Sequence, residues 1–443
     1  MRPSRLPGRR ALTLSFAAAL LVSGAACGSS GGGGGSSQAS GTQSITVAMH
    51  YPSPPKAVLD QFTKQTGIKV NWVEIGWDDL QTKIAAAATS NSYFADATDV
   101  DWSKVGEYAK TGWFLPMGKW FNASSLKADM PQLGTFMTRG ELVGMPFDAS
   151  FIVTTVNSKD FKKAGVSTVP STLSGFSSAL AKVRSHGMSS PLDIHFAAAE
   201  GLSTCWYQMT AAFGGQVLDS AGNPQFTSPS SAGSKALTWM VNAYKSGLVP
   251  KGNINETDYQ GFTTEMARNR VAAEMCDYSG SVASIYQVPS TSSVVNDTEY
   301  IPTPGASGVG GNVANPDGIG IPKTAKNVAG AVKFIKWFTA TENQATWAGL
   351  QGAKDVVSTF PLPARLSSFN LLVNHGNSNG ASQLEGIIKT HAQAPFPNGA
   401  PPWYVQFSAS VQTNIHEAAA GQETVQQAVS AIASEVSQLK SSG

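Results

Sequence analysis

The sequence predicts an exported α/β protein with two domains. An export signal opens the chain, segments typical of strands and helices alternate after it, and the length exceeds that of one ordinary domain. About 400 of the 443 residues follow the signal and a Gly/Ser tract, which is enough for two domains.

The first 27 residues have the parts of a secretory signal. Four arginines precede an apolar run over residues 11–21, and the small residues at 24–26 lead to Cys27. The apolar run is too short to span a bilayer as a mature helix. The segment resembles a bacterial lipoprotein signal, although Gly24 stands where such signals usually carry Leu or Val.

Residues 28–43 form a Gly/Ser-rich tether that behaves as a flexible chain. Lipid on Cys27 would then hold the exported protein at the outer face of the cytoplasmic membrane. Simple cleavage that leaves Cys27 unmodified is the alternative.

The charge of the mature chain argues against a nucleic-acid binder. Four of the 31 Lys and Arg residues lie before Cys27, which leaves 27 basic residues against 29 acidic ones, a net charge of −2. Basic runs are absent, and no apolar stretch of about 18 residues follows Cys27. We therefore expect a water-soluble body.

Two cysteines remain in the body, Cys205 and Cys276. In an oxidising compartment two such residues often pair. Two buried thiols are the alternative, because the sequence does not give the Cα separation that a disulfide requires.

Strands alternate with helices over the first hundred residues of the body, which is typical of parallel βαβ units. The predicted strands cover residues 45–49, 68–72 and 95–100. The helices that follow them lie between Pro55 and Gly67, over residues 78–88, and around Val105 and Tyr108. Asp78 and Gln81 have the spacing of a capping box for the second helix.

Helical patterns dominate the rest of the chain. The apolar spacing predicts helices with apolar faces over residues 173–183, 237–244, 328–338 and 425–439, and strands over 151–156 and 271–275. Thr424 and Gln427 form a second capping-box pattern.

The usual catalytic and metal-binding signatures are missing from the sequence. The six histidines are scattered without paired ligand spacing, and the one GxSxG match lies in the tether. Asp99 and Asp101 offer paired carboxylates for a glycosidase, but the sequence does not place them across a scissile bond. We therefore expect no catalytic residues, metal or cofactor.

Aromatic residues stand beside carboxylates or amides where strands end or helices start. Ligands bind at the carboxyl ends of strands in open α/β sheets, and aromatic rings with bidentate acceptors suit sugars. The candidate ligand-binding residues of this kind are His50, Tyr51, Trp77, Asp78, Asp101, Trp102, Phe147, Asp148, Trp206, Asp277, Tyr278, Trp403 and Tyr404.

Each candidate also has a structural interpretation. Trp77 with Asp78, and Asp101 with Trp102, would serve equally as helix starts with packing. Trp206, interpreted as a helix start, and Trp403, after two prolines, lie in loop-like settings that favour ligand contact.

Several segments together resemble the extracellular solute-binding proteins of carbohydrate ABC importers, the bacterial extracellular solute-binding family 1. The segment DVDWSKVGEYAKTG looks like the third strand and helix of that family, and MPFDA looks like its first crossing between lobes. The segments that carry the resemblance are residues 99–112, 145–149, 156–165, 320–344 and 361–365.

The resemblance implies a two-lobed periplasmic-binding-protein-like fold of type II, with mixed sheets flanked by helices and a hinge of three crossings. The crossings are expected near Ala149, Pro316 and Asp355. The N-terminal lobe would then hold residues 44–149 and 316–355, and the C-terminal lobe 150–315 and 356–443. By position, Gly311 and Asn312 join the candidate ligand-binding residues.

The resemblance also implies a monomeric receptor that captures a small carbohydrate and delivers it to ABC transporter permease subunits. Two alternatives remain at this point. The same fold would serve a peptide or a polyamine, and a secreted carbohydrate-active enzyme would cleave the sugar.

Overall fold

The computed structural model describes residues 43–258, 262–279, 281–350, 362–374 and 381–442. Cys27 and all but the last residue of the tether lie outside the described residues, as does Asp355, near which the third crossing is expected. No described helix is long and apolar enough to cross a membrane. The chain from Thr42 onward groups as one unit by its contacts.

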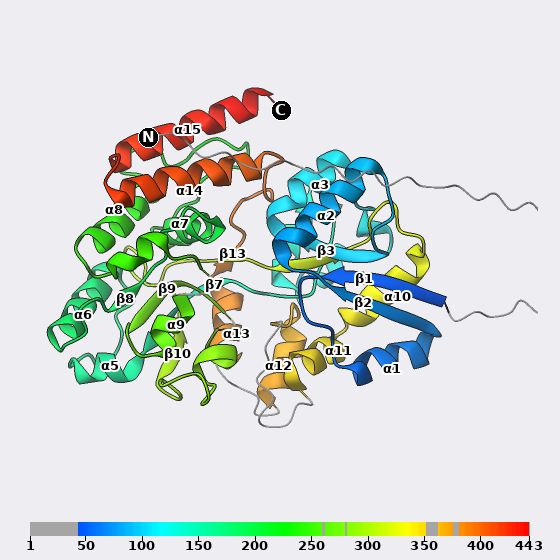
Figure 1. Ribbon diagram of the computed structural model, residues 1–443, viewed down its shortest axis with the longest axis horizontal. Helices are drawn as coiled ribbons and strands as arrows, with labels where there is room; N and C mark the ends of the chain where they lie inside the picture. Colours follow the sequence, from blue (N-terminus) through cyan, green and yellow to red (C-terminus); the bar gives the residue numbers. More distant parts are fainter. Residues whose placement is uncertain (1–42, 259–261, 280, 351–361, 375–380, 443) are drawn as a thin grey trace, which may run out of the picture. The chain divides into compact units, whose positions relative to one another are not determined.

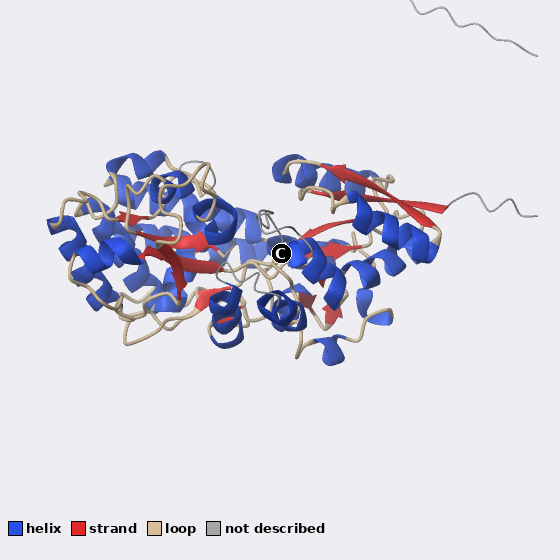
Figure 2. Cartoon of the chain, turned by 90° about the horizontal axis from the view of Figure 1, so that it is seen from below, coloured by secondary structure: helices blue, strands red, loops and turns tan. Residues whose placement is uncertain are grey.

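Two mixed sheets flanked by helices organise the described chain (Figures 1 and 2). The first has five strands in the order β2-β1-β3-β12-β6, and the second has four in the order β10-β7-β9-β8. The strands of the first sheet are β1 (Gln43–Met49), β2 (Ile68–Glu74), β3 (Ala97–Asp101), β6 (Met145–Pro146) and β12 (Asp317–Gly320). Those of the second are β7 (Ile152–Asn157), β8 (Leu192–Asp193), β9 (Ala273–Tyr278) and β10 (Thr298–Ile301).

Helices supply much of the rest of the described chain (Figure 1). Those around the first sheet are α1 (Lys56–Thr66), α2 (Trp77–Ser90), α3 (Val105–Thr111), α4 (Ala123–Leu126), α10 (Val328–Phe338), α11 (Thr341–Ala345) and α12 (Leu366–Asn374). The others are α5 (Ser158–Lys163), α6 (Leu173–Ser185), α7 (Glu200–Ala212), α8 (Ala232–Lys245), α9 (Phe262–Ala267), α13 (Ala381–Thr390), α14 (Tyr404–Ala420) and α15 (Val425–Ser442). Two small sheets complete the fold, β4 (Met137–Thr138) with β5 (Glu141–Leu142), and β11 (Asn312–Val313) with β13 (Ala392–Gln393).

The first sheet combines parallel βα units with one strand, β12, that runs the other way. β1 pairs in parallel with β2 and β3, as the alternation of strands and helices predicts. β12 pairs antiparallel with β3 on one side and with β6 on the other. Consequently Asp317, the first residue of β12, lies directly opposite Asp101, the last residue of β3.

Helix ends follow local chemistry in most places. Gly67 ends α1 with φ 72°, and its N–H donates to the carbonyl of Thr63. The predicted capping box at Thr424 and Gln427 is confirmed, because each residue donates its backbone N–H to the side chain of the other.

The predicted capping box of α2 is wrong. The helix begins at Trp77 with Gly76 as its N-cap, and no side chain caps it. The amide of Gln81 donates instead to Oδ2 of Asp99, 2.9 Å away. The side chain of Gln81, which the local pattern assigned to the helix start, therefore binds the buried carboxylate of Asp99 from another part of the chain.

Trp206 lies in the middle of α7 and not at a helix start as predicted. Residues 201–212 of this helix are all buried. A helix that is buried on all sides lacks the amphipathic period from which helix ends are predicted, and this accounts for the misplaced start.

A disulfide joins α7 to β9 through Cys205 and Cys276, with 5.1 Å between their Cα atoms. The pairing that the sequence left open is therefore present. Cys276 has φ 69° at a bulge, where two residues of β9 oppose one of β7. The bulge and the disulfide thus occupy the same point of the second sheet.

The chain passes between the two sheets in segments that the structure describes only in part. Residues 147–151 join β6 to β7, and residues 314–316 join β11 to β12. α12 packs on α11, and Arg365 just before it forms an ion pair with Asp129 at 2.8 Å. α12 also packs on α13, and the expected boundary at residue 356 stays a prediction.

Replacing both Cys205 and Cys276 by serine is expected to lower the free energy of unfolding by about 2–4 kcal/mol, because the disulfide restricts the unfolded chain. Urea unfolding of the exported chain from Cys27 onward measures the change. Cys27→Ser is the matched control and should leave the unfolding curve unchanged. Equal stability of the double variant and the wild type would contradict the expectation.

Candidate functional site

Carboxyl groups gather at one edge of the five-stranded sheet, and we name this group the acid cluster. β1 ends just before His50 and Tyr51, β3 carries Asp99 and ends at Asp101, and β12 begins at Asp317. Asp148 follows β6 and donates its backbone N–H to the carbonyl of Asp317 at 3.3 Å. The acid cluster consists of His50, Tyr51, Asp99, Asp101, Asp148 and Asp317.

Neutral donors satisfy part of the acid cluster. The hydroxyl of Tyr51 lies 2.6 Å from Oδ2 of Asp317 and 3.1 Å from Oδ2 of Asp148. The indole N–H of Trp77 donates to Oδ2 of Asp101 at 3.1 Å. Tyr51 therefore holds together two carboxyl groups that arrive from different parts of the chain.

Burial sets the protonation of the cluster. It lowers the pKa of His50 to about 4, so that this imidazole is neutral at pH 7. Burial raises the pKa of Asp148 to about 6. The pKa of Asp317 lies well above its usual range, first because of burial and then because of the neighbouring carboxylates of Asp99, Asp101 and Asp148.

Some buried acceptors of the cluster have no hydrogen-bond partner. Oδ1 of Asp99 and Oδ1 of Asp148 are both unpartnered, and both residues are fully buried. His50 Nδ1 lies 3.7 Å from Oδ1 of Asp99, beyond hydrogen-bond distance. A ligand with several donors would satisfy these atoms, and an unpartnered buried polar atom is costly.

Aromatic rings lie beside the acid cluster, and we name this second group the aromatic cluster. Trp102 follows Asp101 directly, and its ring centroid lies 5.4 Å from that of Tyr404 and 6.2 Å from that of Phe396. Tyr404 opens α14, whereas Trp102 follows β3, so elements of both sheets meet here. The aromatic cluster consists of Trp102, Tyr207, Phe396, Trp403, Tyr404 and Phe407.

Glu200 connects the two clusters. It opens α7, and its carboxylate accepts hydrogen bonds from the hydroxyls of Tyr404 and Ser408. Burial raises the pKa of Glu200 to about 7; the charge of Asp101 also raises it, and that of Lys104 lowers it. Glu200 therefore lies within electrostatic reach of the carboxyl end of β3.

A cavity of about 530 Å³ opens beside the aromatic cluster. Its walls come from the β4–β5 turn, the loop at residues 218–222, the segment from Phe396 to Trp403, and Lys440. Gly106 of α3 also lines it, and a side chain there would overlap the carbonyl oxygen of Ala400. The volume is in the range of small-molecule sites.

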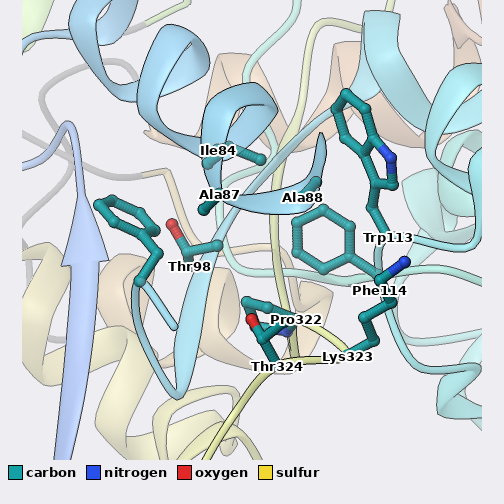
Figure 3. A pocket seen from close by; sticks show the side chains of 10 residues that line it. Ile84, Ala87, Ala88, Thr98, Trp113, Phe114, Pro322, Lys323 and Thr324 are labelled. Carbon is teal, nitrogen blue, oxygen red and sulfur yellow. The ribbon is translucent and has the colours of Figure 1, made fainter. Parts of the chain in front are cut away.

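A second cavity is too small for a solute of that size. It lies between α2 and the segment at residues 322–324 and has a volume of about 20 Å³ (Figure 3). Its lining is mostly apolar, with Ile84, Trp113 and Phe114 among the residues that face it (Figure 3). It has room for about one water molecule.

The structure brings several predicted residues together and leaves others in the core. His50, Tyr51, Asp101 and Asp148 meet in the acid cluster, and Trp77 donates to it. Trp102, Trp403 and Tyr404 belong to the aromatic cluster. The side chain of Asp78 is not described.

Trp206 and Phe147 are fully enclosed by protein. Trp206 donates its indole N–H to the carbonyl of Gly233 at 2.9 Å and packs on Phe226. Phe147 lies against Tyr51 and Phe338. Their rings pack the core in this structure, so neither presents a free face.

Asp277 and Tyr278 lie at the end of β9, in the second sheet. Asp277 is fully buried and accepts hydrogen bonds from Thr155 and Ser281, both at 2.6 Å. Tyr278 donates to Oδ2 of Asp258 at 2.6 Å. Their partners lie outside both clusters.

Gly311 and Asn312 lie next to β13. The amide of Asn312 donates to the carbonyl of Ile152 at 2.7 Å and the residue is buried, whereas Gly311 accepts from Gln208 at 3.0 Å. Both residues therefore make hydrogen bonds that join elements around the second sheet.

Sequence reasoning missed Asp317, Glu200 and Lys104 as site residues. Asp317 sits in a Gly/Pro-rich passage with no aromatic neighbour, and only its pairing opposite Asp101 places it in the acid cluster. Glu200 carries a weak signal, since an acidic residue is favoured at a helix start. Lys104 has none.

The chain resembles known proteins in both sequence and fold. Residues 50–345 match the family model described as bacterial extracellular solute-binding protein. No curated protein matches the chain.

Solved structures of similar fold include three with bound or named ligands. The maltose-bound MalE3 protein of T. maritima is 19% identical, with TM-score 0.74 over 89% of this chain and 99% of that chain. A solute-binding protein of Agrobacterium vitis with bound D-mannitol is 21% identical, with TM-score 0.71 over 90% and 99%. The cyclic alpha-maltosyl-1,6-maltose binding protein of Arthrobacter globiformis is 18% identical, with TM-score 0.74 over 91% and 100%. The predicted α/β periplasmic-binding-protein fold is confirmed.

The raised pKa of Asp148 gives a pH-dependent stability. Between about pH 4 and 6 the folded state holds a proton that the unfolded state releases, so this contribution is lost as the pH rises through about 6. Urea unfolding of the wild type and Asp148→Asn at pH 4 and 7 measures it. We expect the wild type to lose about 2 kcal/mol more than the variant between these values.

Asp79→Asn, at an exposed position, is the control and should follow the wild type at both pH values. Parallel pH dependences of the wild type and Asp148→Asn would contradict the assignment.

Proposed function

The chain belongs to the family of bacterial extracellular solute-binding proteins, and from that premise we propose that it is a carbohydrate or polyol receptor for an ABC importer. The family consists of receptors that bind solutes without turning them over, which sets aside the enzyme alternative.

One observation carries the choice of a polyhydroxylated ligand: buried acceptors and aromatic rings lie side by side at strand ends. Asp101 accepts from Trp77 and directly precedes Trp102, which contacts Tyr404. Carboxylates take hydrogen bonds from sugar hydroxyls, and rings stack on the C–H faces of the sugar. The maltose and D-mannitol bound by the two structural neighbours support the same ligand class.

In this proposal the acid cluster binds the polar edge of the ligand and the aromatic cluster covers its faces. The ring of Trp403 is half-buried and forms part of the wall of the 530 Å³ cavity. Trp77 donates to Asp101, and Trp102 follows it directly in the chain. Ligand is thus held between elements of both sheets.

Entry of a ligand requires the two sheets to move apart, because the acid cluster is largely buried. We place two segments of the hinge at residues 147–151 and 314–316. Closure is favoured when the closed state gains more contacts with ligand than the open state.

Export and anchoring follow as parts of the same proposal. Lipid on Cys27 and the tether at residues 28–43 would keep the receptor near its permease and raise the local concentration. Cys27→Ser is expected to move the protein from the membrane fraction to the fluid outside the cell. Retention of that variant in the membrane fraction would contradict the anchor.

Ligand screening tests the function. A thermal-shift screen of mono- and oligosaccharides and sugar alcohols is expected to raise the Tm with at least one, because a ligand stabilises the state that binds it. With that ligand, Trp403→Ala should weaken the affinity by about tenfold or more, roughly the loss of one stacking contact. Calorimetric titration measures the affinity.

Trp403→Phe retains a ring and should bind more tightly than Trp403→Ala. Trp120→Ala removes a half-buried tryptophan that contacts Lys119 outside both clusters, and it should bind like the wild type. Binding by Trp403→Ala equal to the wild type would remove this residue from the site. Stabilisation by peptides alone, with no response to sugars, would overturn the proposed function.

A further inference from the structure

Carboxyl groups crowd the site far more than hydrogen bonding to a neutral sugar requires. Four aspartates belong to the acid cluster, and Glu200 lies within electrostatic reach of Asp101. Among the described residues that act on these carboxyl groups, Lys104 is the cation, and it acts on Glu200. His50 is neutral at pH 7 and therefore offers no countercharge.

The sheet register forces two of these carboxylates together. Asp101 and Asp317 lie directly opposite each other on the antiparallel strands β3 and β12. Residues paired in this way have Cβ atoms about 5 Å apart, and like charges there destabilise a sheet. The arrangement is therefore incomplete without a positive charge or bound protons.

Buried acceptors without a hydrogen-bond partner indicate, independently of the charge, that the acid cluster lacks a donor. Oδ1 of Asp99 lies within the cluster, 3.7 Å from the imidazole of His50, and has no hydrogen-bond partner. Oδ1 of Asp148 is also without a partner, and both aspartates have 0% exposed surface. Their other oxygens accept from Gln81 and Tyr51, so each carboxyl group still has an acceptor free for a ligand donor.

We propose that the ligand is an amino sugar, whose ammonium group lies among Asp99, Asp101, Asp148 and Asp317 while its ring packs on the aromatic cluster. This inference rests on the proposed function and specifies its ligand. An ammonium group brings three donors and one positive charge in a compact volume. It therefore supplies both the missing donors and the missing charge.

A metal ion fits the cluster less well. No group of three or more His, Cys, Asp or Glu side chains among the described residues has the arrangement that would hold one. Tyr51 also stands between Asp148 and Asp317 and already donates to them. A cation that donates hydrogen bonds suits this setting better than one that needs direct oxygen ligands.

Matched pairs of ligands test the inference. Each pair consists of a sugar and its 2-amino-2-deoxy form: D-glucose with D-glucosamine, D-galactose with D-galactosamine, and cellobiose with chitosan disaccharide. Calorimetric titration at pH 6.5 is expected to show the amino form binding about tenfold or more tightly in at least one pair, the range of a charge-assisted hydrogen bond. N-acetylation of that ligand removes the charge and should abolish the preference.

Variants separate a charge effect from a structural one. Asp317→Asn and Asp99→Asn keep the shape of the side chain, and each should reduce the ratio of amino-sugar to neutral-sugar affinity. A variant that only loosens the site would weaken both ligands equally and leave the ratio unchanged. Asp60→Asn, an exposed acid of α1 that pairs with Lys56 outside both clusters and the cavity, is the control and should keep the wild-type ratio.

The outcomes distinguish this inference from the proposed function. Neutral sugars that bind as tightly as their amino forms would overturn the inference and leave the carbohydrate receptor standing. Binding of spermidine without binding of any sugar or amino sugar would overturn both. An unchanged affinity ratio in both Asp317→Asn and Asp99→Asn would also overturn it, since the charge would then reside elsewhere.

Discussion

The crowding of carboxyl groups at one edge of the five-stranded sheet is the constraint on which the rest of the site depends. Asp101 and Asp317 face each other across two strands, and Asp148 is hydrogen-bonded to the backbone of Asp317. Buried like charges are tolerated only when donors, protons or cations compensate them. Tyr51 supplies one such donor to two of these groups, which makes a phenol the centre of the first-sheet side of the site.

Chain topology creates this crowding. β12 follows β3 by about two hundred residues, yet it inserts between β3 and β6 and brings Asp317 to the strand ends. The second sheet contributes through α7 and α14, whose first residues, Glu200 and Tyr404, are joined by a hydrogen bond. The disulfide between α7 and β9 ties the helix that carries Glu200 to its own sheet. Rigid elements on both sides therefore support the proposed ligand contacts.

Local patterns predicted the fold well, because alternating strands and an amphipathic helix such as α10 are encoded by neighbouring residues. The pairing of β12 with β3 is a long-range contact, and the sequence around Asp317 carries no periodic signal for it. Burial in the folded chain determines which aromatic candidates line a cavity and which pack the core. Trp403 follows two prolines and lines a cavity, whereas Trp206 lies in a helix buried on all sides, and a single sequence does not separate these settings.

Gly106 shows how closely α3 approaches the loop that leads to α14. A Cβ atom at this position would overlap the carbonyl oxygen of Ala400 and crowd Pro401 and Pro402. Backbone atoms therefore set the distance between α3 and this loop, and even one methyl group at residue 106 would push them apart. Substitutions of the aromatic and acidic residues around the proposed site can change its ligand range. Residue 106, in contrast, has to remain glycine for α3 and the loop at residues 400–402 to stay in contact.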